Sequence, residues 1–214
     1  MEREMPTAMV GGSFDPTHWG HLHLVHTVVA STSYRRFIFV PVSRNNFKQD
    51  ADPPIEAEHR LQMLRLSIAS YQKRYPDDPP LECIIEECEI NRGGISYTFD
   101  TVRYLYRHYM IAGRLAIVMG NDLLEGLPKW YAYEKLKQLV RFVVIQREAV
   151  SSISPGDTEG EILHLQNIMM EDSSTQIRRA CAQLSADEPL PQEIASLMPE
   201  EVARYVDEHR LYRT

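Results

Sequence analysis

Apolar runs of strand length alternate with amphipathic helical segments along the first part of this chain, and this alternation limits the folds that it can adopt. The strand-like runs are Thr7–Gly12, Phe37–Val42, Leu81–Ile90, Leu115–Met119 and Phe142–Ile145. The helical segments between them are Gly20–Ala30, Glu56–Arg74, Thr98–Met110 and Tyr133–Val140. Such alternation is typical of β-α-β units, and fully apolar strands are typically buried on both faces. We therefore expect an α/β fold with a doubly wound, mostly parallel sheet between flanking helices.

The pattern changes after Arg147 and predicts a smaller, mostly helical C-terminal part. Polar, Pro and Gly residues predict a loop, one apolar run predicts a last strand, and two periodic segments predict helices. In chain order these are Val150–Glu161, Ile162–Ile168, Ser173–Leu184 and Pro199–His209. A length of 214 residues suits one domain. We expect a single domain over 1–214, with the core β-α units in 1–147 and the C-terminal part in 148–214.

Charge and cysteine content disfavour several classes of protein. The formal net charge of −7 argues against a nucleic-acid binder, because phosphate backbones attract basic surfaces. The three cysteines, Cys83, Cys88 and Cys181, lack the spacing of a disulfide framework or a zinc site. The first residues lack the apolar core of a signal peptide, and no apolar run reaches the ~20 residues of a membrane span. We therefore expect a cytoplasmic protein without nucleic-acid or membrane partners.

The segment Gly11–His21, GGSFDPTHWGH, stands between the first strand and the first helix and carries the most specific signal. Ligands of parallel α/β sheets bind beyond the carboxyl ends of the strands. Two glycines there permit a sharp turn and a close approach of the backbone to a ligand. The N–H groups at the start of the following helix favour an anion, and His18 and His21 can point into one pocket. The segment thus predicts a site for phosphate groups.

This string resembles the nucleotidyltransferase signature G-G-[ST]-F-D-P-x-H-x-G-H, and further motifs extend the resemblance. The chain is similar to the bacterial nicotinate-mononucleotide adenylyltransferases over nearly its whole length. The segments that match are His59–Leu64, Ser96–Thr101, Gly120–Asp122, Pro128–Tyr131, Ser173–Arg178 and Val202–Tyr212. The chain departs from the family pattern at Asp172, where the family often has Ile, and in the residues before Lys48 and after Arg147.

The resemblance implies a Rossmann-like fold and transfer of the adenylyl group of ATP to nicotinate mononucleotide, a step of NAD biosynthesis that releases pyrophosphate. It implies that His18 and His21 are catalytic and contact the phosphates of ATP. The ATP-binding residues are expected to be Gly11, Gly12, Ser13, Phe14, His18, His21, Gly120, Asp122, Ser174, Thr175 and Arg178. The acceptor is expected to contact Lys48, Thr98, Trp130 and Tyr131. Mg²⁺ is expected to travel with ATP, without a metal site built by the protein.

Three other interpretations of these residues stay open. The acceptor could be nicotinamide mononucleotide, which has an amide in place of the carboxylate, or a different phosphate used by another member of the superfamily. A nucleotide-binding sensor would bind the same ligands without catalysis. The motifs Ser96–Thr101 and Pro128–Tyr131 favour nicotinate mononucleotide, and intact His18, His21 and Arg178 argue against a sensor. The oligomeric state is left open.

Overall fold

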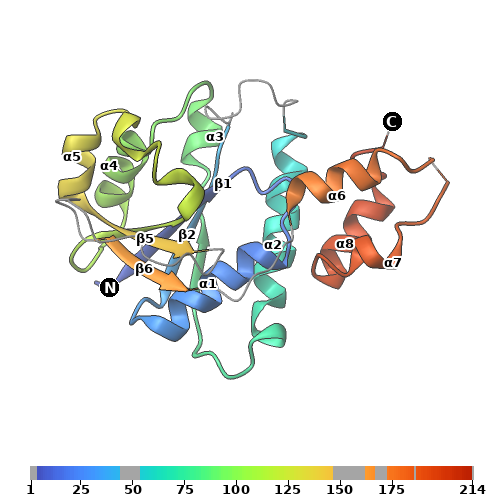
Figure 1. Ribbon diagram of the computed structural model, residues 1–214, viewed down its shortest axis with the longest axis horizontal. Helices are drawn as coiled ribbons and strands as arrows, with labels where there is room; N and C mark the ends of the chain where they lie inside the picture. The colour runs from blue at the N-terminus through green and yellow to red at the C-terminus, as the bar shows by residue number, and fades with distance from the viewer. Residues whose placement is uncertain (1–3, 44–53, 147–161, 167–172, 186, 214) are drawn as a thin grey trace.

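The computed structural model describes residues 4–43, 54–146, 162–166, 173–185 and 187–213. Within these residues, six strands form one parallel sheet in the order β3-β2-β1-β4-β5-β6 (Figure 1). The strands are β1 (Thr7–Gly12), β2 (Arg36–Pro41), β3 (Glu82–Ile85), β4 (Leu115–Gly120), β5 (Val140–Gln146) and β6 (Ile162–Gln166). The strand order changes direction between β1 and β4, which confirms the prediction of a doubly wound, Rossmann-like sheet.

Helices cover both faces of this sheet. The first face carries α1 (Trp19–Ser31) and α2 (Ala57–Arg74). The second face carries α3 (Cys88–Arg92), α4 (Thr98–His108), α5 (Tyr133–Leu139) and the short 3-10 helices η1 (Asn121–Leu123) and η2 (Leu127–Lys129). The C-terminal helices are α6 (Ser174–Cys181), α7 (Gln192–Ala195) and α8 (Glu200–Glu208), and they lie beyond α2, away from the sheet (Figure 1). None of the helices within the described ranges is long and apolar enough to cross a membrane.

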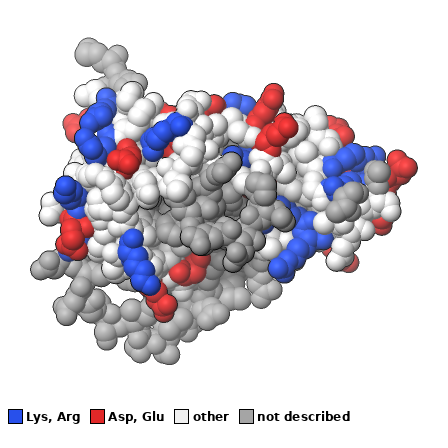
Figure 2. Space-filling model, turned by 90° about the horizontal axis from the view of Figure 1, so that it is seen from above, with Lys and Arg blue, Asp and Glu red and all other residues white. Residues whose placement is uncertain are grey.

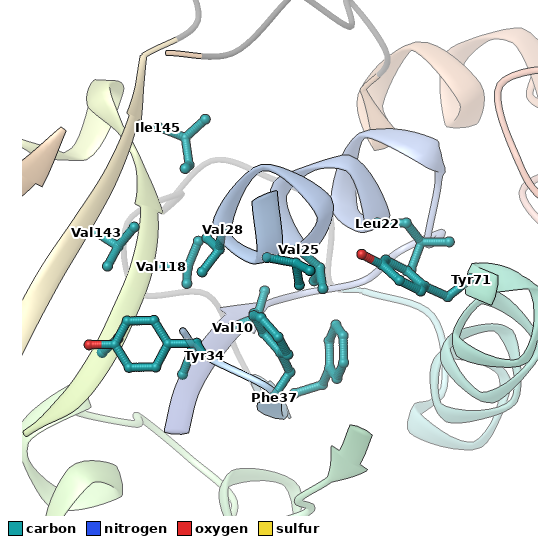
Figure 3. Close-up of a cluster of buried hydrophobic side chains, with 14 of the residues drawn as sticks. Val10, Leu22, Val25, Val28, Tyr34, Phe37, Tyr71, Val118, Val143 and Ile145 are labelled. Atoms are coloured by element: carbon teal, nitrogen blue, oxygen red, sulfur yellow. The ribbon is translucent and has the colours of Figure 1, made fainter. Parts of the chain in front are cut away.

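The alternation of side chains along each strand divides the core between the two faces. In β1, Ala8 and Val10 pack with the α1 side, whereas Met9 packs with the α4 side. Figure 3 shows Val25 and Val28 of α1 pointing toward the strands on the first face. Burial on both faces explains why the central parts of β1, β2 and β4 are apolar at successive positions rather than at every second one.

Helix α2 belongs to two cores at once. Its residues Leu64 and Tyr71 pack toward the sheet, whereas Met63 lies among the buried side chains of α6 and α8. Met63 is fully buried, and so is Val202 of α8. The C-terminal helices are therefore attached to the β-α units through α2. The single-domain organisation over 1–214 stays a prediction.

Most predicted elements lie within two residues of their observed bounds, but one prediction is half wrong. The predicted strand Leu81–Ile90 stops at Ile85, and the chain then forms α3. The carboxylate of Glu86 accepts a hydrogen bond of 2.9 Å from the N–H of Cys88, which favours a turn over an extended chain. Helix α7 was also not predicted. The predicted loop Val150–Glu161 lies outside the described residues.

Glu89 of α3 holds this region to the start of α4. Its side chain is buried, and the hydroxyl of Thr101 donates to its Oε1 atom over 2.5 Å. Burial raises the pKa of the Glu89 carboxyl above its ordinary value of 4.5, and the hydrogen bond from Thr101 opposes this rise. The cost of burying an ionised carboxylate therefore grows as the pH rises.

We predict that Glu89→Gln becomes stabilising, relative to the wild type, as the pH increases. The folded-state pKa lies above the unfolded one, so the favourable contribution of Glu89 is complete below about pH 4.5 and is lost as the pH passes the folded-state pKa. Glutamine keeps the acceptor for Thr101 and stays neutral. Urea denaturation should show that the free energy of unfolding of Glu89→Gln, relative to the wild type, is higher at pH 8 than at pH 4.5. The exposed control Glu125→Gln should show no such change, and a parallel pH response of the two variants would contradict the prediction.

Candidate active site

The site lies where β1 and β4 end next to each other, at the change of strand order. The register places Val10 beside Val118. Two residues further along, β1 ends at Gly12 and β4 ends at Gly120. Both strand ends are followed by segments that carry predicted site residues. This is the crevice at which open α/β sheets bind their ligands.

The loop after β1 is fixed by side chains from distant parts of the chain. Arg60 of α2 donates from Nη1 to the carbonyl oxygens of Ser13 (2.8 Å) and Val42 (2.9 Å). Ser174 and Arg178 of α6 reach the same loop from the other side. The hydroxyl of Ser174 donates to the carbonyl of Pro16 (2.9 Å), and Arg178 donates from Nη1 to the carbonyl of Asp15 (2.5 Å). The loop is therefore held between α2 and α6.

Arg60 was not among the predicted site residues, although it lies in one of the matching motifs. Its side chain is only 2% exposed, and its Nε also donates to the carbonyl of Ile55. Burial lowers the pKa of the guanidinium, and the nearby carboxylate of Asp15 opposes this effect. The available signal was that Arg60 shares one face of a predicted helix with Met63 and Leu64, because a cation on an apolar face requires several acceptors.

The two glycines of the loop have a different role from the one expected. Neither Gly11 nor Gly12 has a left-handed backbone, and the turn is made instead at Phe14, which has a φ of 50°. The ring of Phe14 is fully buried and lies under Gly12 and against the ring of His21. Gly11 is exposed, and a Cβ atom added there would meet nothing within 4 Å. Open backbone at the strand end favours close approach of a ligand, whereas the sharp-turn argument for Gly11 and Gly12 is wrong.

The two histidines form the N-terminal cap of α1. The Nδ1 atom of His18 accepts a hydrogen bond from the N–H of Gly20 (3.1 Å), and the Nδ1 atom of His21 accepts one from the N–H of His18 (3.3 Å). The ring centroids of His18 and His21 lie 4.0 Å apart. Since each neutral ring accepts through Nδ1, its hydrogen is on Nε2. The geometry therefore provides two N–H donors side by side.

This cap also changes the expected anion site at the start of α1. The N–H of Trp19 donates to the carbonyl of Leu197 (3.0 Å), and the N–H of His21 donates to the carbonyl of His18 (3.0 Å). The N–H of Gly20 is bonded to His18. The first N–H groups of the helix thus already have acceptors. The imidazole rings, rather than these N–H groups, are the donors that α1 can offer to an anion.

Helix α6 carries a second group of donors. Ser173 caps this helix by accepting from the N–H of Gln176, as the capping-box spacing predicts. Thr175 accepts from Nη2 of Arg178 over 3.4 Å. Because α6 is bonded to the loop through Ser174 and Arg178, the loop after β1 and the late motif are brought together. Asp172, which precedes this motif, lies outside the described residues.

The structure brings together only some of the residues that were predicted to bind the acceptor mononucleotide. Thr98 begins α4, and Trp130 follows η2. The exposed ring of Tyr131 contacts Tyr97 (ring centroids 4.7 Å apart) and Phe99 (6.2 Å), so the two predicted motifs meet through aromatic rings. Asp122 is exposed in η1, just after Gly120. Lys48 lies outside the described residues.

A cavity of 770 Å³ opens at the opposite, amino end of the sheet. Its lining includes Ser31, Arg114 and Arg141 and none of the predicted site residues, so it is separate from the candidate active site.

On the face in Figure 2, Lys and Arg residues are interspersed with Asp and Glu residues, and several of the Lys and Arg residues gather over the C-terminal helices. One of these helices, α6, carries Arg178 and Arg179 in its last turn.

Known proteins share both the sequence and the fold of this chain. The family model described as cytidylyltransferase-like matches residues 9–180. The nicotinate-nucleotide adenylyltransferase of Bacillus subtilis is 33% identical over 207 residues, which cover 95% of this chain and 96% of that protein. A probable nicotinate-nucleotide adenylyltransferase of Treponema pallidum is 34% identical over 222 residues, which cover 98% of this chain and all of that protein (100%).

A solved structure of nicotinic acid mononucleotide adenylyltransferase from Plasmodium falciparum, complexed with NaAD, has a TM-score of 0.71 and 17% identity, with 98% of each chain covered. At that identity the likeness shows a shared fold. The matches to the family model and to the two bacterial relatives show more, because they extend over most or nearly all of the chain. The chain therefore belongs to the cytidylyltransferase-like family and, within it, to the nicotinate-nucleotide adenylyltransferases.

Proposed function

We propose that this protein transfers the adenylyl group of ATP to nicotinate mononucleotide and releases pyrophosphate, forming nicotinate adenine dinucleotide for NAD biosynthesis. The observation that carries the proposal is the pair of imidazole donors, His18 and His21, at the end of β1, on a loop that is also bonded to Arg178. Two imidazole N–H donors and one arginine suit a site in which negatively charged phosphates meet. Membership of the nicotinate-nucleotide adenylyltransferases supports the choice of acceptor.

The reaction requires no base from the protein. A phosphate oxygen of nicotinate mononucleotide attacks the α-phosphorus of ATP, a new P–O bond forms, and the bond to pyrophosphate breaks. A phosphate monoester is largely dianionic near neutral pH, because its second pKa is about 6. The nucleophile is therefore already ionised. Catalysis then consists of positioning the two phosphates and stabilising the charge that moves to the leaving group.

The histidines are suited to this task as donors. Their Nδ1 atoms are engaged in the cap of α1, and Nε2–H is the group that each ring can direct to a phosphate oxygen. Because the rings are held by the helix start, they need little reorganisation during the reaction. Arg178, Ser174 and Thr175 approach from α6, and we propose that they bind the phosphates from that side.

We propose that Mg²⁺ enters with ATP. Within the described residues, no three His, Cys, Asp or Glu side chains are grouped so as to hold a metal ion. The carboxylate of the loop, Asp15, is directed to Tyr212 and Arg178. Phosphate oxygens and water therefore fit Mg²⁺ better as ligands than side chains of this site. When bound, the ion would neutralise part of the phosphate charge.

We propose that nicotinate mononucleotide binds on the second face of the sheet. We propose that the ring of Trp130 stacks on the pyridine and that the backbone near Thr98 and Tyr131 receives its carboxylate. The contact of Tyr131 with Tyr97 and Phe99 supports this, because it joins the start of α4 to the segment after η2. Lys48 stays a prediction for the acceptor phosphate.

The proposed function is tested by pyrophosphate release with ATP, Mg²⁺ and a panel of acceptor phosphates. We predict that kcat/KM for nicotinate mononucleotide exceeds that for nicotinamide mononucleotide by at least about tenfold, or roughly 1.4 kcal/mol. The physical reason is that backbone donors favour a carboxylate over an amide. Equal rates for the two acceptors would remove the assignment of substrate, and activity only with another acceptor phosphate would replace it.

We predict that His21→Ala lowers kcat by about 10²–10³-fold, the range for the loss of one preorganised donor. The affinity for ATP should fall less, because a donor that strengthens in the transition state affects kcat more than KM. His21→Asn should restore part of the rate, since an amide N–H donates but cannot act as a base.

The control for this prediction is His23→Ala on the same helix, whose ring bonds to the hydroxyl of Tyr75 away from the loop. This variant should keep the wild-type kcat. If His21→Ala also keeps it in the pyrophosphate assay, the assignment of His21 fails, and the charge must be stabilised by other groups.

We predict that Trp130→Ala weakens the binding of nicotinate mononucleotide and leaves ATP binding nearly unchanged. Stacking of an aromatic side chain on a base contributes about 1–3 kcal/mol in nucleic-acid sites, and a similar loss is expected here. Trp130→Phe should recover part of it. Equilibrium binding of each substrate separately, with the melting temperature as a control, checks this. Equal damage to both substrates together with a lower melting temperature would indicate a purely structural tryptophan.

A further inference from the structure

The last residues of the chain return to the loop of the candidate active site. Tyr212 belongs to the closing motif of the sequence, for which the proposed reaction has so far supplied no role. Its hydroxyl donates to Oδ1 of Asp15 over 2.8 Å, across a sequence separation of 197 residues. Asp15 is only 5% exposed, so this hydrogen bond lies largely out of water. The end of the chain thus contacts the loop directly.

Tyr212 is held firmly in place. The side chain of Leu211 is buried in the core formed by α6, α8 and Met63. Arg213 donates to the carboxylate of Asp207 and to the carbonyls of Ser185 and Glu188. Anchors on both sides of Tyr212 fix its ring relative to Asp15.

Asp15 in turn faces Arg178. Its Oδ2 atom lies 4.0 Å from Nη1 of Arg178, and the same Nη1 donates to the carbonyl oxygen of Asp15. One carboxylate oxygen is therefore bonded to Tyr212, and the other lies beside the arginine proposed to bind phosphate. At 4.0 Å the ion pair is a loose one, and the side chain of Arg178 is still about a third exposed (32%).

We propose that Tyr212 is a positioning residue: by holding the Asp15 carboxylate through a hydrogen bond, it keeps Arg178 turned toward the phosphates of ATP. This inference rests on the proposed function. Without the hydroxyl, the buried Oδ1 of Asp15 loses the donor that Tyr212 provides. The carboxylate then gains by rotating toward Arg178, and the tightened ion pair competes with ATP for the guanidinium.

The protonation state of the Tyr212 hydroxyl fits this role. Burial raises the pKa of the Tyr212 hydroxyl, and the neighbouring Asp15 carboxylate raises it further. Tyr212 therefore stays protonated near neutral pH and donates to Asp15. A pH profile of the reaction is accordingly not expected to show the titration of this residue.

The test compares Tyr212→Phe with the matched control Tyr205→Phe. Each variant loses one hydroxyl from a half-buried ring, but Tyr205 bonds to His59 between α2 and α8, away from the loop. Tyr212→Phe should raise the Kd of Mg-ATP and the KM for ATP about tenfold, as expected for a lost hydrogen bond to a charged group. The KM for nicotinate mononucleotide should change less than twofold, and Tyr205→Phe should change neither constant.

A double-mutant cycle with Arg178→Gln distinguishes positioning from a general structural effect. If Tyr212 acts through Arg178, Tyr212→Phe should change kcat/KM for ATP less than twofold in the Arg178→Gln background. All variants are assayed at a temperature at which circular dichroism shows them folded. Equal losses in both backgrounds, or equal losses for the two substrates, would overturn the proposal. If the wild type shows no pyrophosphate release, the proposed function is overturned. If the wild type is active and Tyr212→Phe has the same KM and Kd for ATP as the wild type, only this inference is overturned.

Discussion

Beyond the end of β1 the chain leaves the sheet, and its peptide groups lose the neighbouring strands that would otherwise bond to them. Three side chains supply donors there: Arg60 from α2, and Ser174 and Arg178 from α6. A buried carbonyl group left without a donor costs about 1–3 kcal/mol, so these bonds determine the path of the loop. The path of the loop that leads to His18 and His21 then depends on two helices that lie far apart in the sequence.

A cluster of hydrogen-bond donors and cations forms the site, although the protein as a whole is acidic. Its formal net charge is −7, yet two imidazoles and two arginines gather at the loop, beside the carboxylate of Asp15. The imidazoles are oriented by the same hydrogen bonds that begin α1. One pair of residues thus performs two tasks, because it caps the helix through Nδ1 and presents N–H donors through Nε2. Such a preorganised site suits a reaction whose nucleophile is already charged.

The sequence predicts well what depends on local periodicity. The strand over Thr7–Gly12 has the bounds that its apolar run indicates, and the helix over Glu56–Arg74 shifts by one residue. It fails where a side chain redirects the backbone, as Glu86 does before α3. Family motifs indicated His18, His21 and the late motif, whose helix the structure bonds to the loop.

The remaining features of the site depend on contacts between segments far apart in the sequence. No local pattern indicates that Arg60 reaches the carbonyl of Ser13, or that Tyr212 reaches Asp15. The capping role of the histidines was equally hidden, because Ser, Thr, Asp and Asn are the usual residues at that position. The contacts of Lys48 stay a prediction.

Because α2 packs in two cores, the parts of the protein cannot all fold at the same stage of synthesis. While the chain is being synthesised, α2 emerges early and can cover the sheet, but Met63 awaits partners from α6 and α8. N-terminal segments begin to fold first during synthesis. An apolar surface therefore stays open on the nascent chain, beside a loop that still lacks Ser174 and Arg178. The loop after β1 therefore gains its bonds to Ser174 and Arg178 only after the C-terminal helices have left the ribosome.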